Sequence, residues 1–194
     1  MTVQEQVRVF IAVPLDPALR DAAAGLRRRL DATADLLRWV PPGNLHLTLK
    51  FLGEIAERRV ARVKEAVREA ARRSEPFTIR LTGAGAFPSV RRPQVVWVGV
   101  GDGSEALVAL ARDLDAALRR LKFPRERRPF RPHLTVARAK HARPLPDLSG
   151  PLSGLEGLDV GTQSVDTVVV MESQLHPSGA IYRPLEEVGL GEAA

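Results

Sequence analysis

Two short segments of the chain repeat the pattern His-x-Thr. The first, NLHLTL, contains His46 and Thr48, and the second, RPHLTV, contains His133 and Thr135. Two imidazoles suit the cleavage of a phosphodiester, because one can accept a proton from the attacking oxygen while the other donates a proton to the leaving oxygen near neutral pH. The threonine hydroxyls can donate hydrogen bonds to the non-bridging phosphate oxygens.

Both segments are apolar and rich in strand-forming residues, so we expect each to be a β-strand. Because side chains alternate between the faces of a strand, His46 and Thr48 should share one face while Leu47 points into a core. The same holds for the second copy, in which Leu134 points inward. If two lobes pack face to face, two histidines and two threonines converge on one cleft.

The motif has two other interpretations. A single His-x-Thr is common in strands, where threonine is favoured and histidine can be a satisfied core residue. Two copies in matching contexts, in a chain with 4 histidines, favour a functional pair instead. A metal site is not expected, because the chain has no His-x-x-x-His pair, no cysteine and no carboxylate at ligand spacing in either strand.

The rest of the sequence alternates strand-like and helix-like segments. Strands are expected at residues 7–13, 36–40, 46–52, 77–86, 94–100, 133–137, 166–173 and 180–188. Helices are expected after Asp16-Pro17 as far as Leu30, over residues 60–70, and from residue 104, with Ser104 as its N-cap, to residue 121. Residues 87–93 and 143–161 are expected to be loops.

Length and composition indicate a globular protein. The chain has 194 residues, 44% of them hydrophobic and 27% charged, and no segment long enough to cross a membrane. No residue is cysteine and no signal peptide is recognisable, so we expect a cytoplasmic protein. We predict one α+β domain over residues 1–194, made of two interleaved lobes. The net charge of +6 is compatible with a nucleic-acid partner but is weak support by itself.

An ordered set of motifs extends over nearly the whole chain. These motifs are RVFIAVPL at residues 8–15, HLTLKFLGE at 46–54, AFPSVRRPQVVWVGV at 86–100, FRPHLTVARA at 130–139 and ESQLHPSGAIY at 172–182. Together they resemble the two-histidine (2H) phosphoesterases, and within that superfamily the RNA 2′,3′-cyclic phosphodiesterases, also called the 2′-5′ RNA ligase family.

The resemblance implies a fold and a mechanism. The expected fold is bilobal, with two pseudo-symmetric lobes of antiparallel sheet and outer helices around a central cleft. The expected reaction is hydrolysis of RNA 2′,3′-cyclic phosphates to 2′-phosphates without a metal or other cofactor. In that mechanism His46 is the general acid for the leaving 3′-oxygen and His133 is the general base for water.

The resemblance also implies substrate-binding residues. Thr48, Thr135 and Arg138 would contact the phosphate, and Phe10 in the first strand would face the cleft, where it could stack on a base. A core role for Phe10 is equally compatible with the sequence. Strict alternation from His133 would aim Arg138 away from the cleft, so Arg138 reaches the phosphate only if the strand ends or bulges near Ala137.

Other functions in the same cleft stay open. One is 2′-5′ RNA ligation or cleavage of 2′-5′ linkages, and another is binding of a nucleotide or RNA without catalysis. The expected partner is RNA ending in a 2′,3′-cyclic phosphate, with no membrane partner, and the protein is expected to be a monomer. A basic run over residues 119–131 could hold an RNA backbone, or could be a solvated helix end and loop.

Overall fold

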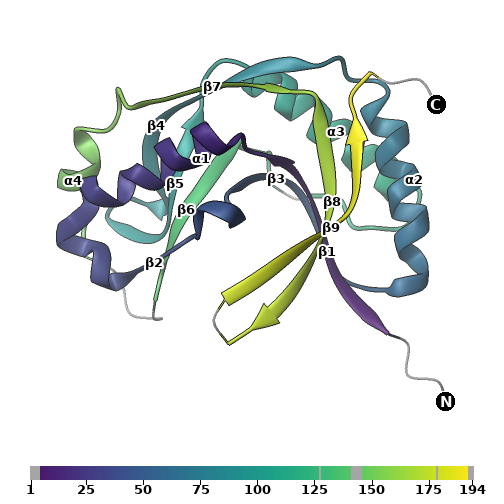
Figure 1. The fold of residues 1–194 in the computed structure, drawn as a ribbon, viewed down its shortest axis with the longest axis horizontal. Coiled ribbons are helices and arrows are strands. Elements are labelled where there is room, and N and C mark those ends of the chain that lie inside the picture. Colours follow the sequence, from purple (N-terminus) through teal and green to yellow (C-terminus); the bar gives the residue numbers. More distant parts are fainter. Residues whose placement is uncertain (1–4, 127, 141–145, 178, 192–194) are drawn as a thin grey trace.

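The structure, a computed structural model, describes residues 5–126, 128–140, 146–177 and 179–191, with only the backbone described for residues 31–35. Its strands form one curled antiparallel sheet (Figure 1). They are β1 (Gln6–Pro14), β2 (Leu37–Trp39), β3 (His46–Ala56), β4 (Phe77–Ser89), β5 (Arg92–Val100), β6 (His133–Ala139), β7 (Asp159–Val165), β8 (Thr167–His176) and β9 (Gly179–Gly189). The strand order is β7-β4-β5-β6-β3-β1-β8-β9, with β2 paired to β6.

The sheet consists of two halves that meet at β3 and β6. We call β1, β3, β8 and β9 the first lobe, and β2 together with β4 to β7 the second lobe. Within each lobe the strands pair over long stretches, whereas β3 and β6 share the single pair Leu47↔Leu134. The two strands that carry the His-x-Thr motifs therefore form the junction between the lobes.

Each lobe is covered by at least one helix that comes from the other half of the sequence. They are α1 (Pro17–Ala24), α2 (Val60–Ala71), α3 (Ser104–Arg119) and α4 (Ser149–Ser153), with 3-10 segments η1 (Gly25–Leu36), η2 (Pro42–Asn44) and η3 (Glu57–Arg59). Helix α1 packs on β7 of the second lobe, and α3 packs on α2 and on β3 of the first (Figure 1). Each lobe is thus covered by a helix from the other half of the sequence.

The helices follow from their apolar spacing. Val63, Val67 and Ala70 form the buried face of α2, and α3 buries a stripe that includes Leu107 and Leu114. Strand β1 is buried from Val9 to Val13, and it lies inside the sheet between β3 and β8. Within the described residues no helix is long and apolar enough to cross a membrane.

The α+β antiparallel fold class is confirmed, and four local expectations need correction. Helix α1 ends at Ala24, and a 3-10 segment continues the chain to Leu36, kinked at Leu30, although Leu26 and Leu30 are buried as their spacing predicted. Ser104 is the first residue of α3, whose N-cap is Gly103 in the left-handed conformation, at φ 77°.

The two expected loops were also partly wrong. Residues 87–93 form the tight end of the β4–β5 hairpin, in which Ser89 pairs with Arg92. The loop expected over residues 143–161 begins outside the described residues, and its remainder contains α4 and the start of β7. Both elements are short, and α4 contains glycine and proline, so neither has the apolar periodicity by which a sequence reveals a strand or helix.

Candidate active site

The register of β3 and β6 brings the two motifs together. Extending the pair Leu47↔Leu134 by one residue in each direction sets His46 opposite Thr135, and Thr48 opposite His133. Leu47 and Leu134 are buried, while both histidines and both threonines are partly exposed on the other face. The two motifs therefore form one local arrangement with approximate two-fold symmetry.

The two imidazoles are held by the same hydrogen bond. Nδ1 of His46 lies 2.8 Å from the carbonyl oxygen of Asn44, and Nδ1 of His133 lies 2.7 Å from that of Arg131. A carbonyl oxygen can only accept, so Nδ1 must donate its proton in both residues. In the neutral ring Nε2 is then unprotonated, and it is the atom left to exchange a proton with a substrate.

Each motif strand bulges at the same position after its threonine. On β3, Thr48 pairs with Ala12 and Lys50 with the next residue back, so Leu49 is unpaired. On β6, Thr135 pairs with Trp97 and Ala137 with Val96, so Val136 is unpaired. The bulge shifts the alternation by one residue, and consecutive residues become buried on each strand.

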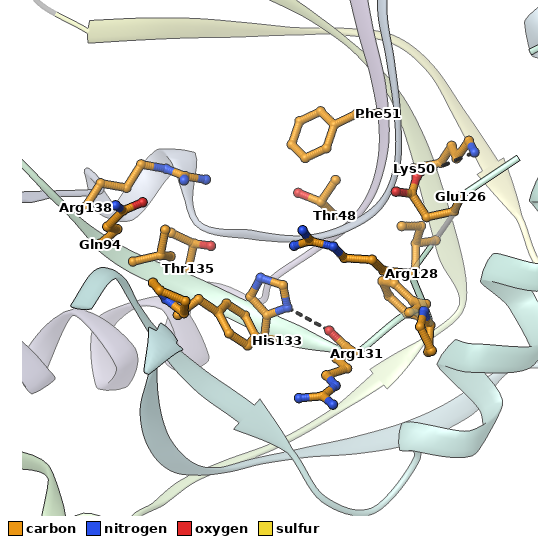
Figure 2. Close-up of a pocket in the computed structure, with 16 residues that line it drawn as sticks. Thr48, Lys50, Phe51, Gln94, Glu126, Arg128, Arg131, His133, Thr135 and Arg138 are labelled. Atoms are coloured by element: carbon orange, nitrogen blue, oxygen red, sulfur yellow. Dashed lines mark hydrogen bonds and ion pairs between the residues drawn. The ribbon is translucent and has the colours of Figure 1, made fainter. Parts of the chain in front are cut away.

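The bulges turn a matching pair of side chains toward the cleft. Arg138 follows the bulge on β6, and it lines the cleft with His133 and Thr135. The sequence allowed Arg138 to face the cleft only if the strand ends or bulges near Ala137, and the structure has that bulge. Phe51 follows the bulge on β3 at the equivalent position, with a side chain 59% exposed. Figure 2 shows both side chains extending toward the space beside Thr48 and Thr135.

The cleft has a volume of about 680 Å³ and extends to both sides of the paired motifs. Gln94, Val95 and Arg138 line one end, and Lys50, Glu126 and Arg128 line the other (Figure 2). His133, Thr135 and Thr48 lie between these ends. His46 is partly exposed on the same face, and rings from β1 and β9 pack against it.

His46 lies between two aromatic rings. Its ring centroid is 4.8 Å from that of Phe10 and 5.2 Å from that of Tyr182, which meets it edge-on. Burial is the main cause that lowers the pKa of His46 below 6.5, since a charged imidazolium loses hydration there. The hydrogen bond to Asn44 opposes this shift, and the positive charge of Arg138 adds a smaller lowering of the same pKa.

Among the residues that the structure describes, His133 has one aromatic neighbour. The ring of Phe87, on β4, meets it edge-on with the centroids 5.0 Å apart. Phe87 in turn packs on Trp97 at 5.3 Å. The second imidazole therefore packs against a ring of its own lobe and lines the cleft.

Phe10 does not have the exposed position that base stacking needs. Its side chain is on the cleft side of β1, opposite Phe51, but it is 1% exposed and covered by His46, Tyr182 and Phe51. The core alternative for Phe10 agrees with this burial. Phe51 lines the cleft with an exposed ring. Aligning HLTLKF with HLTVAR in the sequence would have identified it as the counterpart of Arg138.

No group of three or more histidine or carboxylate side chains that could hold a metal ion occurs among the residues the structure describes. The charged groups around the cleft are mostly arginines, which do not ligate metals.

Comparison with known proteins agrees with the fold and the paired motifs. Residues 10–176 match the model of the 2′-5′ RNA ligase superfamily. The chain therefore belongs to this superfamily of two-histidine phosphoesterases, as the motifs predicted. Its curated relatives include proteins named RNA 2′,3′-cyclic phosphodiesterase. The one from Methanothermobacter thermautotrophicus is 39% identical over 93% of this chain and 97% of its own, and that from Aquifex aeolicus is 32% identical over 95% and 98%.

Solved structures share the fold over almost the full length. A crystal structure of a Thermus thermophilus protein superposes with a TM-score of 0.80 at 31% identity, covering 95% of this chain and 98% of that one. Escherichia coli LigT in complex with 3′-AMP gives a TM-score of 0.76 at 27% identity, covering 97% of this chain and 100% of LigT.

Proposed function

We propose that this protein is an RNA 2′,3′-cyclic phosphodiesterase that opens the cyclic phosphate to a 2′-phosphate by acid-base catalysis at His46 and His133. The observation that carries the proposal is the meeting of the two His-x-Thr motifs across Leu47↔Leu134, with Nδ1 of each ring bound to a carbonyl and Nε2 left for the substrate. The names of the relatives, at up to 39% identity over most of the chain, support the choice of substrate.

In the proposed reaction His133 accepts a proton from water at Nε2 as the water oxygen attacks phosphorus. The bond between phosphorus and the 3′-oxygen breaks on the opposite side. His46 donates its Nε2 proton to that oxygen, which leaves as the ribose 3′-hydroxyl, and the phosphate stays on the 2′-oxygen. One such proton transfer accelerates a reaction by roughly 10²–10⁴-fold.

The other cleft residues bind the substrate in this proposal. Thr48 and Thr135 donate hydrogen bonds to the non-bridging oxygens, and the Arg138 guanidinium neutralises their charge. Phe51 offers an exposed ring on which the terminal base can stack, in place of the buried Phe10. The crystal structure of LigT in complex with 3′-AMP supports a nucleotide as the ligand of a protein with this fold.

The environment of His46 suits a general acid. Burial lowers its pKa, so its imidazolium is a stronger proton donor than an ordinary one, although a smaller fraction is charged in the free protein. A bound phosphate anion offsets this, because a nearby negative charge favours the protonated ring.

The test is an assay on an oligonucleotide ending in a 2′,3′-cyclic phosphate, in excess EDTA, with the product isomer identified. Conversion to a 2′-phosphate is expected. A 3′-phosphate product would reverse which oxygen leaves. Activity that appears only when a divalent metal is added would contradict acid-base catalysis by the histidines alone.

A further inference from the structure

The end of the cleft at Arg128 has no role in the reaction derived above. This end is lined by Lys50, Glu126, Arg128, Pro129 and Phe130, and it is continuous with Thr48 and His133. The terminal cyclic phosphate occupies the space between the two His-x-Thr motifs. The Arg128 end is therefore free for another part of the substrate.

Arg128 is a cation without a partner among the described residues. Its side chain is exposed, and no hydrogen bond, ion pair or ring contact joins it to the part of the chain that the structure describes. Figure 2 shows its guanidinium pointing into the cleft toward Thr48, whereas that of Arg131 points away from Thr48 in the same view. An unpaired guanidinium aimed into a cleft suits an anion, and its fork of donors fits two oxygens of a phosphate.

The neighbouring charged side chains contact one another. Lys50 is 5% exposed, and its ammonium contacts Asp115 at 2.7 Å and the carbonyl oxygen of Pro124 at 2.9 Å. Glu126, the acid in this end of the cleft, lies 3.7 Å from the same ammonium, which it shares with Asp115. Of the described side chains that line this end, Arg128 is the cation that makes no ion pair.

The segment that precedes Arg128 is fixed to the motif strand. Lys50 lies at the bulge of β3, and Asp115 on α3 accepts hydrogen bonds from Lys50 and, at 3.3 Å, from the backbone N–H of Glu126. This link ties residues 124–126 to the strand that carries His46 and Thr48.

We infer that Arg128 forms a second phosphate subsite, for the internucleotide phosphodiester on the 5′ side of the terminal nucleotide. This inference rests on the proposed function. The phosphodiester is the next anion along an RNA chain whose terminal phosphate lies between the two motifs. The subsite makes the protein prefer an oligonucleotide cyclic phosphate to a mononucleotide one.

The test compares two substrates, adenosine 2′,3′-cyclic phosphate and the dinucleotide ApA ending in a 2′,3′-cyclic phosphate. The variants are Arg128→Ala, Arg128→Lys and the control Arg125→Ala, which removes the same charge from the same segment outside the cleft. Arg128→Ala should lower kcat/KM for the dinucleotide about ten-fold or more, as for one charge-assisted hydrogen bond. It should leave the mononucleotide unchanged, Arg128→Lys should retain part of the preference, and Arg125→Ala should change neither rate.

Salt and product binding give independent readouts. The preference of the wild-type protein for the dinucleotide should fall as KCl rises, while Arg128→Ala should show a salt slope reduced by about one. Equal loss on both substrates, or no loss on either, would overturn the subsite. If the wild-type protein hydrolyses neither substrate, the proposed function fails. The subsite is then decided by whether Arg128→Ala weakens binding of ApA 2′-phosphate but not of adenosine 2′-phosphate.

Discussion

The two histidines have the same local structure and different surroundings. Each lies two residues after the carbonyl that accepts a hydrogen bond from its Nδ1–H, at the start of a strand that bulges after the threonine. His46 is enclosed by rings from β1 and β9, and burial lowers its pKa. His133 meets one ring and lines the open cleft. The repeated motif thus fixes the tautomer in both lobes, while neighbours distant in the sequence make the two imidazoles unequal.

The same comparison holds for the residues that follow the bulges. Arg138 and Phe51 occupy equivalent positions, yet one brings a positive charge and the other an exposed ring. A symmetric frame therefore presents an asymmetric pair of side chains. This difference suits a ligand that is itself asymmetric, with a phosphate and a base.

Replacing either histidine should have the largest effect. His46→Ala and His133→Ala should each lower kcat/KM by about 10²–10⁴-fold, because each removes one proton transfer. The control is His176→Ala, which changes a histidine on β8 that does not line the cleft. Circular dichroism should show intact folding of all three variants. Near-wild-type activity of either site variant would mean that the two lobes do not act as a pair.

Arg138→Ala and Phe51→Ala should have different kinetic effects, although both residues follow a strand bulge at equivalent positions. Loss of Arg138 should lower kcat by about 10²–10³-fold, as for a lost donor to transition-state charge. Loss of Phe51 should mainly raise KM, by about 5–150-fold, the range for one base stacked on an aromatic ring. Steady-state kinetics on one oligonucleotide substrate gives both constants. The same pattern of kcat and KM in the two variants would contradict different roles.

Replacing Thr48 and Thr135 compares how much each lobe contributes to binding the phosphate. Thr48→Val and Thr135→Val keep the side-chain shape and remove the hydroxyl, so each should lower kcat/KM by about 10–100-fold, the value of a hydrogen bond to a charged group. Thr78→Val, on an exposed position of β4, serves as the control. Unequal losses would show that one lobe binds the phosphate more strongly than the other.

The pKa of His46 should respond to its enclosure. Its NMR titration should have a midpoint below 6.5, because burial disfavours the charged ring. Tyr182→Ala should raise that midpoint by admitting water, and Arg138→Ala should raise it less, by removing a positive charge. A midpoint of 6.5 or above in the free wild-type protein would show that enclosure does not distinguish His46 as proposed.

The same pKa shift predicts a small dependence of stability on pH. The folded pKa of His46 lies below its unfolded value of 6.5, so the unfolded chain binds more protons as pH falls through 6.5. The resulting contribution to the free energy of unfolding is present above pH 6.5 and is lost as the pH falls toward the folded pKa. Denaturant unfolding of wild type and His46→Asn across this range measures it. A pH dependence that is the same in both proteins would contradict this linkage.

Much of the local structure was predictable from the sequence, and the elements that the sequence did not predict were missed for physical reasons. The apolar spacing of α2 and α3 and the strand character of the two motifs were sufficient to locate these elements. Helix α4 and strand β7 were missed because they are short and lack periodicity. Phe10 could not be assigned from its position in β1, since its burial depends on Tyr182, which arrives from the far end of the chain.

The sequence by itself determined the chemical groups and the face that each motif presents. Two copies of His-x-Thr in apolar strands, with the ordered motifs around them, identified the family and the proposed reaction. Tertiary structure alone decided that β3 and β6 meet at Leu47↔Leu134, and that bulges aim Arg138 and Phe51 at the cleft. It also decided which histidine is enclosed and which is open. These features depend on pairing and packing between residues far apart in the chain, so the local sequence pattern does not predict them.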